Sequence, residues 1–383
     1  MMMDNIINVL ENEFSLKDHK VYAEINLGAL KRNYNRIEKL VRSKGFAKVV
    51  PVIKADAYGH GAVKSMEALK SCGADIFAVS SVFEAIELAN VKKDADILIL
   101  GSSLPSDTDE LLKHDIIQTV YSLEYAKALN SACHGKKLRV HIKLDTGMNR
   151  LGFDAKNTDK TAEEIAEVTK LENLAVQGIF THFACADEPA NENTALQLSR
   201  FENVINKLSE KGVDFKIKHV CNSAGILRED IPLYDAVRAG IILYGLMPSG
   251  SFSYNEFENV MSLKTKISHI HEIDKGDTVS YGADFVADKK MKIATLPIGY
   301  GDGFIRAYSG ATVKINGKPC KIIGRICMDQ CMIDVTGLDA NPGDEVVIFD
   351  KSEEIDTLAK LAGTINYEVV CLVSKRVPRV YTE

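Results

Sequence analysis

No run of apolar residues in this sequence is long enough to cross a bilayer, so we expect no helical membrane span. The stretch Met1–Phe14 also lacks a basic segment followed by an uninterrupted apolar core, because Asp4, Glu11 and Glu13 break its apolar positions. This is not the pattern of a secretory signal, and we expect residues 1–18 to be an N-terminal extension, packed on the body or partly disordered. The expected location is the cytoplasm.

Signatures for metal and nucleotide binding are missing too. The 8 cysteines form no CxxC pair, and no His or Cys follows Cys327 and Cys331 at a zinc-ligand spacing. We therefore expect no metal site, and reduced, buried thiols. Neither GxxxxGK(S/T) nor GxGxxG occurs, so the sequence predicts no nucleotide site. The net charge of −6, without a basic cluster, argues against a nucleic-acid partner.

What the chain does have is length and an alternating pattern. Its 383 residues exceed one ordinary domain, and 46% hydrophobic with 26% charged residues is typical of a globular protein. In the first two-thirds, short apolar runs alternate with amphipathic stretches. Eight runs have the continuous apolar character of buried parallel strands: Val49–Ala55, Ile76–Ser81, Ile97–Ser102, Ile116–Ser122, Leu138–Asp145, Val176–Phe183, Ile217–Ser223 and Ala236–Gly245.

Helical patterns separate these runs. They lie at Val63–Ser71, Val82–Ala89, Leu123–Ala132, Ala162–Thr169 and Leu196–Leu208. Eight strand–helix units predict a (β/α)8 barrel of the TIM type, although a doubly wound open sheet would alternate in the same way.

The pattern changes after Tyr244. The segment Met247–Phe257 is rich in turn residues and is interpreted as a linker. Short β-type runs separated by Gly-containing turns follow it and predict a mostly β C-terminal domain. We therefore expect an α/β chain with the barrel in residues 19–246 and the β-rich domain in residues 247–383. The β-type runs are Leu263–Ile270, Thr278–Tyr281, Lys292–Leu296, Thr312–Ile315, Lys321–Ile323, Cys331–Val335 and Glu345–Phe349.

A barrel of this type has its active site at the C-terminal ends of its strands. Five of the predicted strands place polar residues at or just past these ends, more than chance scatter suggests. These residues are Lys54, Lys143, Asp145, Arg150, His182, His219, Asn222, Ser223 and Arg238.

Several of these residue types suit an anionic ligand with an aldehyde group. Burial at the end of an apolar run would make Lys54 a nucleophile, although a rim lysine with its ammonium in water has the same pattern. Lys143 and Arg150 are two cations on one turn, which suits an anion or a salt-bridged loop. Ser223 is placed to contact phosphate or to cap a helix. Arg238 lies within the last strand, where its charge needs a partner such as a heteroaromatic nitrogen.

Nine segments, in family order along the chain, resemble the alanine racemases, which are fold-type III enzymes that use pyridoxal phosphate (PLP). The resemblance extends from about Val21 to the C-terminus. The segments are VIKADAYGHG (Val52–Gly61), KLDTGMNRLG (Lys143–Gly152), THFACADE (Thr181–Glu188), HVCNSAG (His219–Gly225), VRAGIILYG (Val237–Gly245), SYGADF (Ser280–Phe285), PIGYGDGFIR (Pro297–Arg306), GRICMDQCMID (Gly324–Asp334) and TINYEV (Thr364–Val369).

The resemblance implies a PLP site in the barrel. Lys54 would hold PLP as a Schiff base. Arg238 would face the pyridine nitrogen with His182 beside it, and Arg150 would contact the ring hydroxyl. Lys143 is similar to the lysine that is carbamylated in many family members, which would turn it into an anion able to pair with Arg150. The phosphate would be held by Tyr58, Ser223, Tyr367 and the backbone at Gly240 and Ile241.

The resemblance also implies a homodimer with shared active sites. Racemisation needs acid/base groups on both faces of the cofactor, which Lys54 and Tyr281 would supply. Tyr281 would come from the partner subunit and be tuned by His219 and Arg306. The substrate carboxylate would meet Arg150 and, from the partner, Met328 and Asp329.

The implied reaction is the conversion of L-alanine to D-alanine, which would supply D-alanine for cell-wall peptidoglycan. Racemisation of serine or of a broader range of amino acids stays open, because small changes in a pocket set such a preference. A non-catalytic PLP-binding protein would resemble the barrel alone, and a decarboxylase of the same fold would lack the SYGADF and CMDQ pattern. Five positions depart from the usual family pattern. Asp56 stands in place of Asn, Asn149 in place of Gly, Val369 and Val370 in place of Ile and Pro, and Lys375 in place of Tyr.

Overall fold

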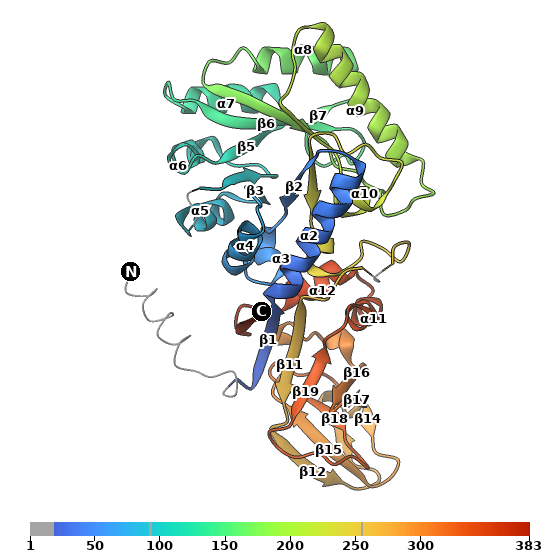
Figure 1. Ribbon diagram of the computed structural model, residues 1–383. Helices are drawn as coiled ribbons and strands as arrows, with labels where there is room; N and C mark the ends of the chain where they lie inside the picture. Colours follow the sequence, from blue (N-terminus) through green and yellow to red (C-terminus); the bar gives the residue numbers. More distant parts are fainter. Residues whose placement is uncertain (1–18, 92–93, 254–255) are drawn as a thin grey trace. The chain divides into compact units, whose positions relative to one another are not determined.

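The computed structural model describes residues 19–91, 94–253 and 256–383, drawn in colour in Figure 1. The chain divides into two compact units. Among the described residues, residues 30–258 form the barrel unit, and residues 19–29 and 259–383 form the β-rich unit. The extension expected at residues 1–18 lies outside the described residues, and the domain limits at residues 19, 246 and 247 stay predictions.

Eight parallel strands form the core of the barrel unit. Their order is β2-β10-β9-β8-β6-β5-β4-β3, and a bridge between Val52 and Ala78 links the two ends of this order. The predicted (β/α)8 barrel is therefore confirmed, and each of the eight predicted runs overlaps one strand. The strands are β2 (Lys48–Pro51), β3 (Ile76–Val79), β4 (Asp96–Ile99), β5 (Ile117–Val120), β6 (Leu138–Asp145), β8 (Leu174–Phe180), β9 (Ile217–His219) and β10 (Ala236–Ala239).

Helices follow the strands and lie outside them (Figure 1). Four of the longer ones, α4, α7, α8 and α9, bury apolar side chains, and several helices begin at a capping side chain. Ser122 accepts the N–H of Tyr125 at 3.1 Å, and Asn157 accepts that of Lys160 at 3.4 Å. The helices are α2 (Leu27–Lys44), α3 (Lys54–Tyr58), α4 (Ala62–Ser71), α5 (Val82–Val91), α6 (Thr108–Lys113), α7 (Leu123–Ala132), α8 (Thr158–Val168), α9 (Asn193–Glu210) and α10 (Ser223–Leu227).

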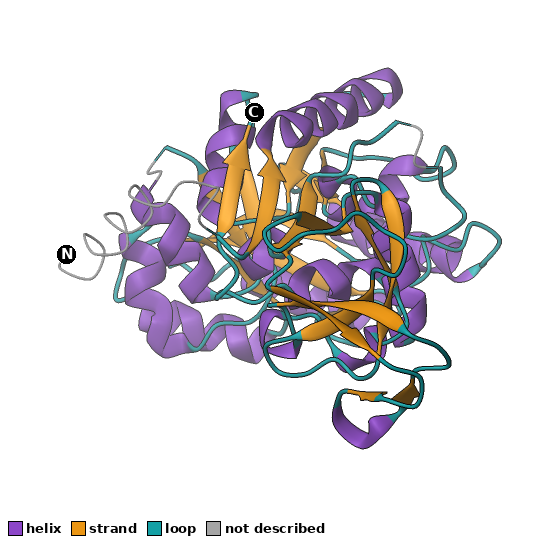
Figure 2. Cartoon of the chain, turned by 90° about the horizontal axis from the view of Figure 1, so that it is seen from below, coloured by secondary structure: helices purple, strands orange, loops and turns teal. Residues whose placement is uncertain are grey.

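The β-rich unit contains a nine-stranded sheet in the order β12-β15-β18-β17-β16-β19-β11-β1-β20, with strands drawn in orange in Figure 2. This confirms the mostly β C-terminal part of the predicted fold. Two helices, α11 (Ser352–Ala362) and α12 (Asn366–Leu372), belong to it. The strands are β1 (Val21–Asn26), β11 (Met261–Lys266), β12 (His269–Ile273), β15 (Met291–Leu296), β16 (Thr312–Ile315), β17 (Lys318–Ile323), β18 (Cys331–Asp334), β19 (Glu345–Phe349) and β20 (Arg379–Thr382).

Two details of this unit differ from the prediction. The run Leu263–Ile270 is two strands, because the backbone changes partner at its centre: Ile267 N–H bonds to Asp344, whereas Ser268 N–H bonds to Thr295. Strands β1 and β20 were not predicted. They pair with each other in parallel, and β1 pairs antiparallel with β11. These pairings join residues hundreds of positions apart, so a local pattern does not reveal them.

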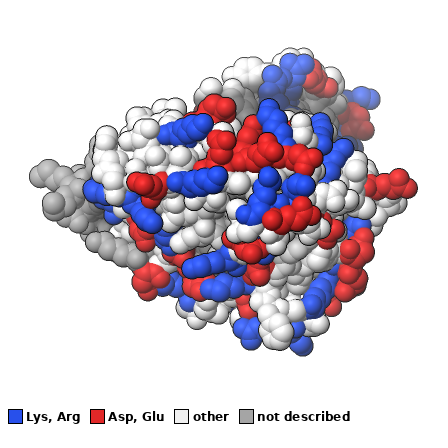
Figure 3. Space-filling model, turned by 90° about the horizontal axis from the view of Figure 1, so that it is seen from above, with Lys and Arg blue, Asp and Glu red and all other residues white. Residues whose placement is uncertain are grey.

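Lys and Arg side chains lie among Asp and Glu side chains over the face drawn in Figure 3. None of the described helices has the length and hydropathy needed to span a membrane. None of the 8 cysteines, all of which lie in the described part of the chain, forms a disulfide, and Cys133, Cys221, Cys320 and Cys331 are buried. The expectation of buried thiols is wrong for Cys371 in α12, which is exposed.

Candidate active site

Lys54 begins α3 three residues after the end of β2, and an unusual backbone follows it. The four residues Ala55 to Tyr58 have φ angles between 51° and 54°, in the left-handed region. Left-handed backbone costs about 1–2 kcal/mol per non-glycine residue. Other contacts must therefore stabilise this turn. Because Lys54 directly precedes it, the same contacts help to fix the position of Lys54.

Glu84 supplies the first of these contacts. One carboxylate oxygen accepts the N–H of Ala55 at 2.6 Å, directly after Lys54. The other accepts the N–H groups of Ser80 at 2.8 Å and Ser81 at 3.2 Å, where β3 ends. Glu84 thus ties the left-handed turn to the neighbouring strand of the barrel.

His60 and Asp56 supply the others. His60 is fully buried, and its Nδ1 lies 3.0 Å from the carbonyl oxygens of both Ala57 and Tyr58. Carbonyls only accept, so Nδ1 carries the proton. Asp56 Oδ1 accepts the N–H of Ala62, the first residue of α4, at 2.7 Å. An Asn at position 56 has the same acceptor atom, which explains why Asp is tolerated there.

Tyr58, Ser223 and Gly240 converge on one small space. The N–H of Gly240 donates to Ser223 Oγ at 3.0 Å. A Cβ atom at Gly240 would lie 2.9 Å from Tyr58 Oη and 3.5 Å from Ser223 Oγ, so a side chain there would fill the space. Ile241 follows as a fully buried residue at the start of a short 3-10 helix, Ile241–Tyr244.

Ser223 does not cap α10. The capping side chain is that of Asn222, whose Oδ1 accepts the N–H of Gly225 at 3.0 Å. The hydroxyl of Ser223 is directed instead to the backbone of Gly240. The capping alternative for Ser223 is therefore wrong.

Lys143 is a buried amine at the end of β6. Its Nζ donates to the carbonyl of Leu144 at 2.6 Å, and its side chain is 5% exposed. Burial lowers the pKa of Lys143 to about 7, and the charges of Arg238 and Arg150 act in the same direction, against the opposite effect of Asp145. A substantial fraction of this amine is therefore neutral at pH 7.

Asp145 organises the turn that follows. Its two carboxylate oxygens accept the backbone N–H groups of Gly147, Asn149 and Arg150 at 2.8–3.0 Å. Burial alone would raise the pKa of Asp145, but these hydrogen bonds outweigh it and hold the pKa below its usual value. Asn149 has a φ of 53°, and Asn tolerates this region better than other non-glycine residues, which accounts for its presence in place of Gly. The side chain of Arg150 is exposed.

Arg238 lies in β10 and is 2% exposed. Its guanidinium donates to His219 Nδ1 at 2.9 Å and to the carbonyls of Thr181 and Val220 at 2.7 and 3.0 Å, and it lies 3.3 Å from His182 Nδ1. Burial lowers the pKa of Arg238 to about 10, so it stays charged at neutral pH. Its donors go to imidazole nitrogens and carbonyl oxygens.

The cations of this rim act together on His182. Burial first, and then the positive charges of Arg238, Arg150, Lys143 and Lys54, hold the pKa of His182 well below its usual value. Four basic side chains from three strands, or from the loops that follow them, therefore act on one neutral imidazole. Such a pocket suits an anionic ligand.

In the β-rich unit, two further predicted residues lie close together. Tyr281 is 72% exposed, and Met328 is 53% exposed. Ser280 Oγ donates to the Arg325 carbonyl at 2.6 Å and lies 3.4 Å from Cys327 Sγ. The turn that carries Tyr281 is therefore attached to the segment that carries Met328.

The remaining predicted residues also lie in this unit. The Asp329 carboxylate accepts a hydrogen bond from Arg376 Nη2 at 2.6 Å, and Arg376 Nε pairs with Asp302 at the same distance. Arg306 is exposed in a short 3-10 helix, and Tyr367 is half-buried in α12. The predicted residues thus form two groups, one within each unit.

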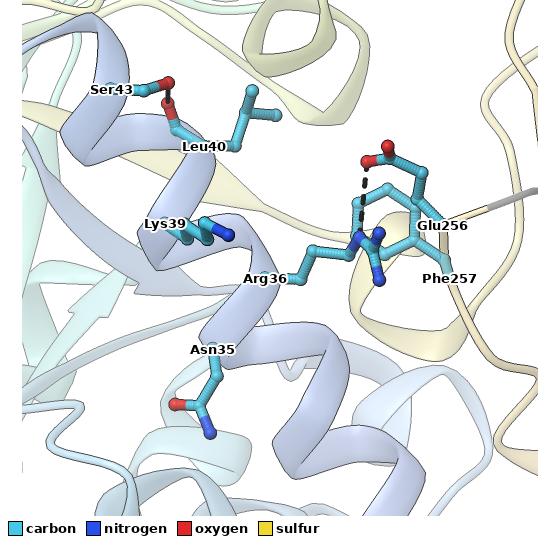
Figure 4. Close-up of a pocket in the computed structure, with 7 residues that line it drawn as sticks. All are labelled: Asn35, Arg36, Lys39, Leu40, Ser43, Glu256 and Phe257. Carbon is cyan, nitrogen blue, oxygen red and sulfur yellow. Dashed lines mark hydrogen bonds and ion pairs between the residues drawn. The ribbon is translucent and has the colours of Figure 1, made fainter.

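A separate hollow lies between α2 and the segment that carries Glu256 and Phe257 (Figure 4). Arg36 Nε and Glu256 Oε2 are 3.2 Å apart across it. The residues that line it include none of those predicted for the site: Asn35, Arg36, Lys39, Leu40, Ser43, Glu256 and Phe257. We therefore place the candidate site at the barrel rim and not in this hollow.

Three residues that hold the predicted site residues in place were not predicted from the sequence. Glu84 and His60 contact the turn after Lys54, and His141 contacts His219. His141 had a detectable signal, because it lies two residues before Lys143 and alternate residues of a strand share a face. Glu84 had none, since it begins a helix and reaches the turn after Lys54 from the next strand.

Fold and site together define a class of protein, a (β/α)8-barrel enzyme with a lysine and a buried arginine in a cationic rim pocket, joined to a β-rich unit. The chain matches the family models described as "Alanine racemase, N-terminal domain" over residues 25–248 and "Alanine racemase, C-terminal domain" over residues 260–381. It belongs to the alanine racemase family and is an amino-acid racemase.

Relatives and solved structures agree with this membership. The chain is 44% identical over 371 residues to alanine racemase 1 of Clostridium acetobutylicum, covering 94% of this chain and 95% of the relative. It is similar to the structure of alanine racemase from Clostridium difficile 630, with 43% identity, a TM-score of 0.91 and 96% of each chain covered. The alanine racemase of Bacillus anthracis with bound L-Ala-P is 33% identical, with a TM-score of 0.89 and 95% of each chain covered.

Proposed function

We propose that this enzyme interconverts L-alanine and D-alanine with PLP bound to Lys54. The observation that carries the proposal is the convergence of Tyr58, Ser223 and Gly240 at the same rim as Lys54, in a chain of the alanine racemase family. We further propose that the reaction takes place in the cytoplasm and supplies D-alanine for peptidoglycan.

The residues of the rim fit PLP. The space that a Cβ at Gly240 would fill is bounded by two hydroxyls, as a phosphate requires. Arg238 would donate to the pyridine nitrogen beside His182, and Arg150 would contact the ring hydroxyl. PLP, when bound, supplies an electron sink that stabilises negative charge at the substrate Cα. The phosphate would be held by Tyr58, Ser223, Tyr367 and the backbone of Gly240 and Ile241.

Two groups of the protein would move the proton. Lys54 Nζ would take the Cα proton on one face, and Tyr281 Oη would serve the opposite face. Arg238 keeps its own proton, because a guanidinium has no acceptor and its pKa stays near 10. Positive charge at the pyridine nitrogen is thereby limited, which should restrict side reactions such as transamination.

The exposed residues of the β-rich unit support a shared site. Tyr281 and Met328 present large, exposed side chains, as expected of residues that meet another subunit. We propose a homodimer in which Tyr281 reaches the partner's barrel. Arg306 would tune it, and His219, whose ring nitrogens lie against Arg238 and His141, would tune it only indirectly. The substrate carboxylate would be bound by Arg150 and by the partner's Met328 and Asp329.

A direct assay tests the proposal. Purified protein loaded with PLP should show the absorbance band of the lysine-bound cofactor and should abolish the optical rotation of L-alanine. L-Serine, tested at the same concentration, measures the alternative of broader specificity. A protein that binds PLP but changes the rotation of neither amino acid would contradict racemisation.

Complementation between inactive variants is expected to restore activity. When Lys54→Ala and Tyr281→Phe dimers exchange subunits at equal amounts, half of the dimers are mixed, and each has one intact site of two. Activity should rise to about a quarter of the wild-type value, because each site takes one residue from each subunit. Mixing Lys54→Ala with the double variant is the control and should restore nothing. No recovery despite demonstrated exchange would mean that each site lies within one subunit.

Lys143 is expected to carry a carbamate. Burial lowers the pKa of Lys143 to about 7, and only the neutral amine attacks CO2, forming an N–C bond and releasing a proton. The neutral fraction grows as the pH rises through 7, so carbamylation should increase in that direction. Carbon-13 NMR with labelled bicarbonate should show a carbamate signal that Lys143→Ala lacks. The absence of this signal at pH 8 would contradict the modification.

A further inference from the structure

His141 is a fully buried polar residue that the proposed reaction does not use. It lies in β6 two residues before Lys143, so the two side chains project from the same face of the strand and His141 is the deeper one. Its Nδ1 lies 3.0 Å from Nε2 of His219. His219 Nδ1 in turn lies 2.9 Å from Arg238 Nη1. The three side chains form a continuous polar chain, the Arg238–His219–His141 chain.

The direction of each hydrogen bond in this chain follows from Arg238. A guanidinium only donates, so His219 Nδ1 must accept and the proton of neutral His219 must be on Nε2. That N–H can donate only to an acceptor, so His141 Nδ1 must be unprotonated, and the proton of neutral His141 is on Nε2, which has no hydrogen-bond partner among the described residues. Burial, followed by the charge of Arg139, lowers the pKa of His141 to about 4, and burial followed by the charge of Arg238 lowers that of His219. Both rings are therefore neutral at pH 7.

The neighbouring strand is adapted to the ring of His141. Gly178 lies opposite His141 in β8, and the register between the strands shifts there, leaving Gln177 as an extra residue. A Cβ atom at Gly178 would lie 2.7 Å from Cε1 and 2.8 Å from Nδ1 of His141. Glycine within a strand normally weakens it. Here its absent side chain makes room for the imidazole.

We propose that His141 is a positioning residue that, by accepting the Nε2–H of His219, fixes the orientation of the Arg238 guanidinium. Without this acceptor, His219 would hold a buried N–H with no partner, which favours rotation of the ring or the other tautomer. The other tautomer would direct an N–H toward Arg238, and a flipped ring would direct a C–H there, so either change removes the lone pair that accepts from the guanidinium. The role assigned to Arg238 at the pyridine nitrogen rests on the proposed function, whereas the hydrogen-bond order rests on the geometry alone.

Two variants of the full-length protein separate the acceptor from the bulk of the ring. In His141→Asn the amide oxygen can take the place of Nδ1, whereas His141→Leu fills similar space without an acceptor. The first readout is nitrogen-15 NMR of the imidazoles in cofactor-free protein. Wild type and His141→Asn should show His219 with its proton on Nε2 and slow to exchange. In His141→Leu this signal should be lost or exchange rapidly.

The second readout is PLP affinity, measured by titration. His141→Leu should weaken PLP binding by about tenfold, the effect of one buried hydrogen bond, and His141→Asn should restore most of it. A wild-type His219 with its proton on Nδ1 would overturn the proposal without any variant, even if His141→Leu fails to fold. Unchanged His219 signals and PLP affinity in His141→Leu would overturn it as well. A wild type that binds no PLP but shows the expected tautomer would contradict the proposed function and leave the positioning role supported.

Discussion

Replacing Lys54 with alanine is expected to reduce alanine racemisation by more than about 10⁴-fold, because the change removes both the covalent attachment of PLP and one of the two acid/base groups. The fold should persist. Lys54 is only half-buried, and the turn that follows it is held by Glu84, Asp56 and His60 through contacts that do not involve the lysine side chain. The midpoint of thermal unfolding of this variant should therefore stay close to that of the wild type, while its racemase activity is lost.

Peptide mapping tests the same assignment directly. Borohydride reduction of the PLP-loaded wild type, followed by proteolysis and mass spectrometry, should place the pyridoxyl group on Lys54. Lys64→Ala is a matched control, because Lys64 is an exposed lysine on α4 that pairs with Glu67, and it should retain full activity. An adduct on another lysine, or an active Lys54→Ala enzyme, would refute the assignment.

Tyr281→Phe is expected to lower racemisation by roughly 10²–10⁴-fold while PLP stays bound, since the hydroxyl is a direct acid/base group and the cofactor bond needs only Lys54. Tyr281 is 72% exposed within the chain, so loss of its hydroxyl should not change folding. Tyr121→Phe is the control. It keeps the ring that stacks on Tyr125 in the barrel unit and should leave activity unchanged.

Solvent deuterium exchange then distinguishes the two faces. By resemblance to the family, the lysine acts on D-alanine and the tyrosine on L-alanine. The Tyr281→Phe enzyme should therefore still exchange the α-proton of D-alanine faster than that of L-alanine, as measured by proton NMR in D2O. Equal residual exchange from both enantiomers would show that one base, or another residue, serves both faces.

The barrel was predictable because its signals are local. Buried parallel strands need continuous apolar runs, and the helices between them need amphipathic ones, so each of the eight strands is visible within a short window. The rim residues followed from the same reading, since the end of each run marks the end of a strand. Arg238 was identified in this way as a charge inside an apolar strand, and the structure supplies its partners, His219 and backbone carbonyls.

The nine-stranded sheet was less predictable, because its order depends on pairings between distant segments. Strand β1 joins β11 and β20, and the continuous run at Leu263–Ile270 is divided where its backbone partners change. Hydrophobic pattern reports how a segment is buried and leaves open which segment lies beside it.

For the site, the sequence by itself determined which charged and hydroxyl groups reach the barrel rim, because residue type and position along a strand decide that. The tertiary structure alone decided how these groups are held. The left-handed turn after Lys54 exists because Glu84 accepts the N–H of Ala55 from 29 residues away. The place of His141 against His219 joins residues 78 positions apart. Such contacts form only when the closed barrel brings strands together, because a buried hydrogen bond is favourable only where the fold supplies its partner.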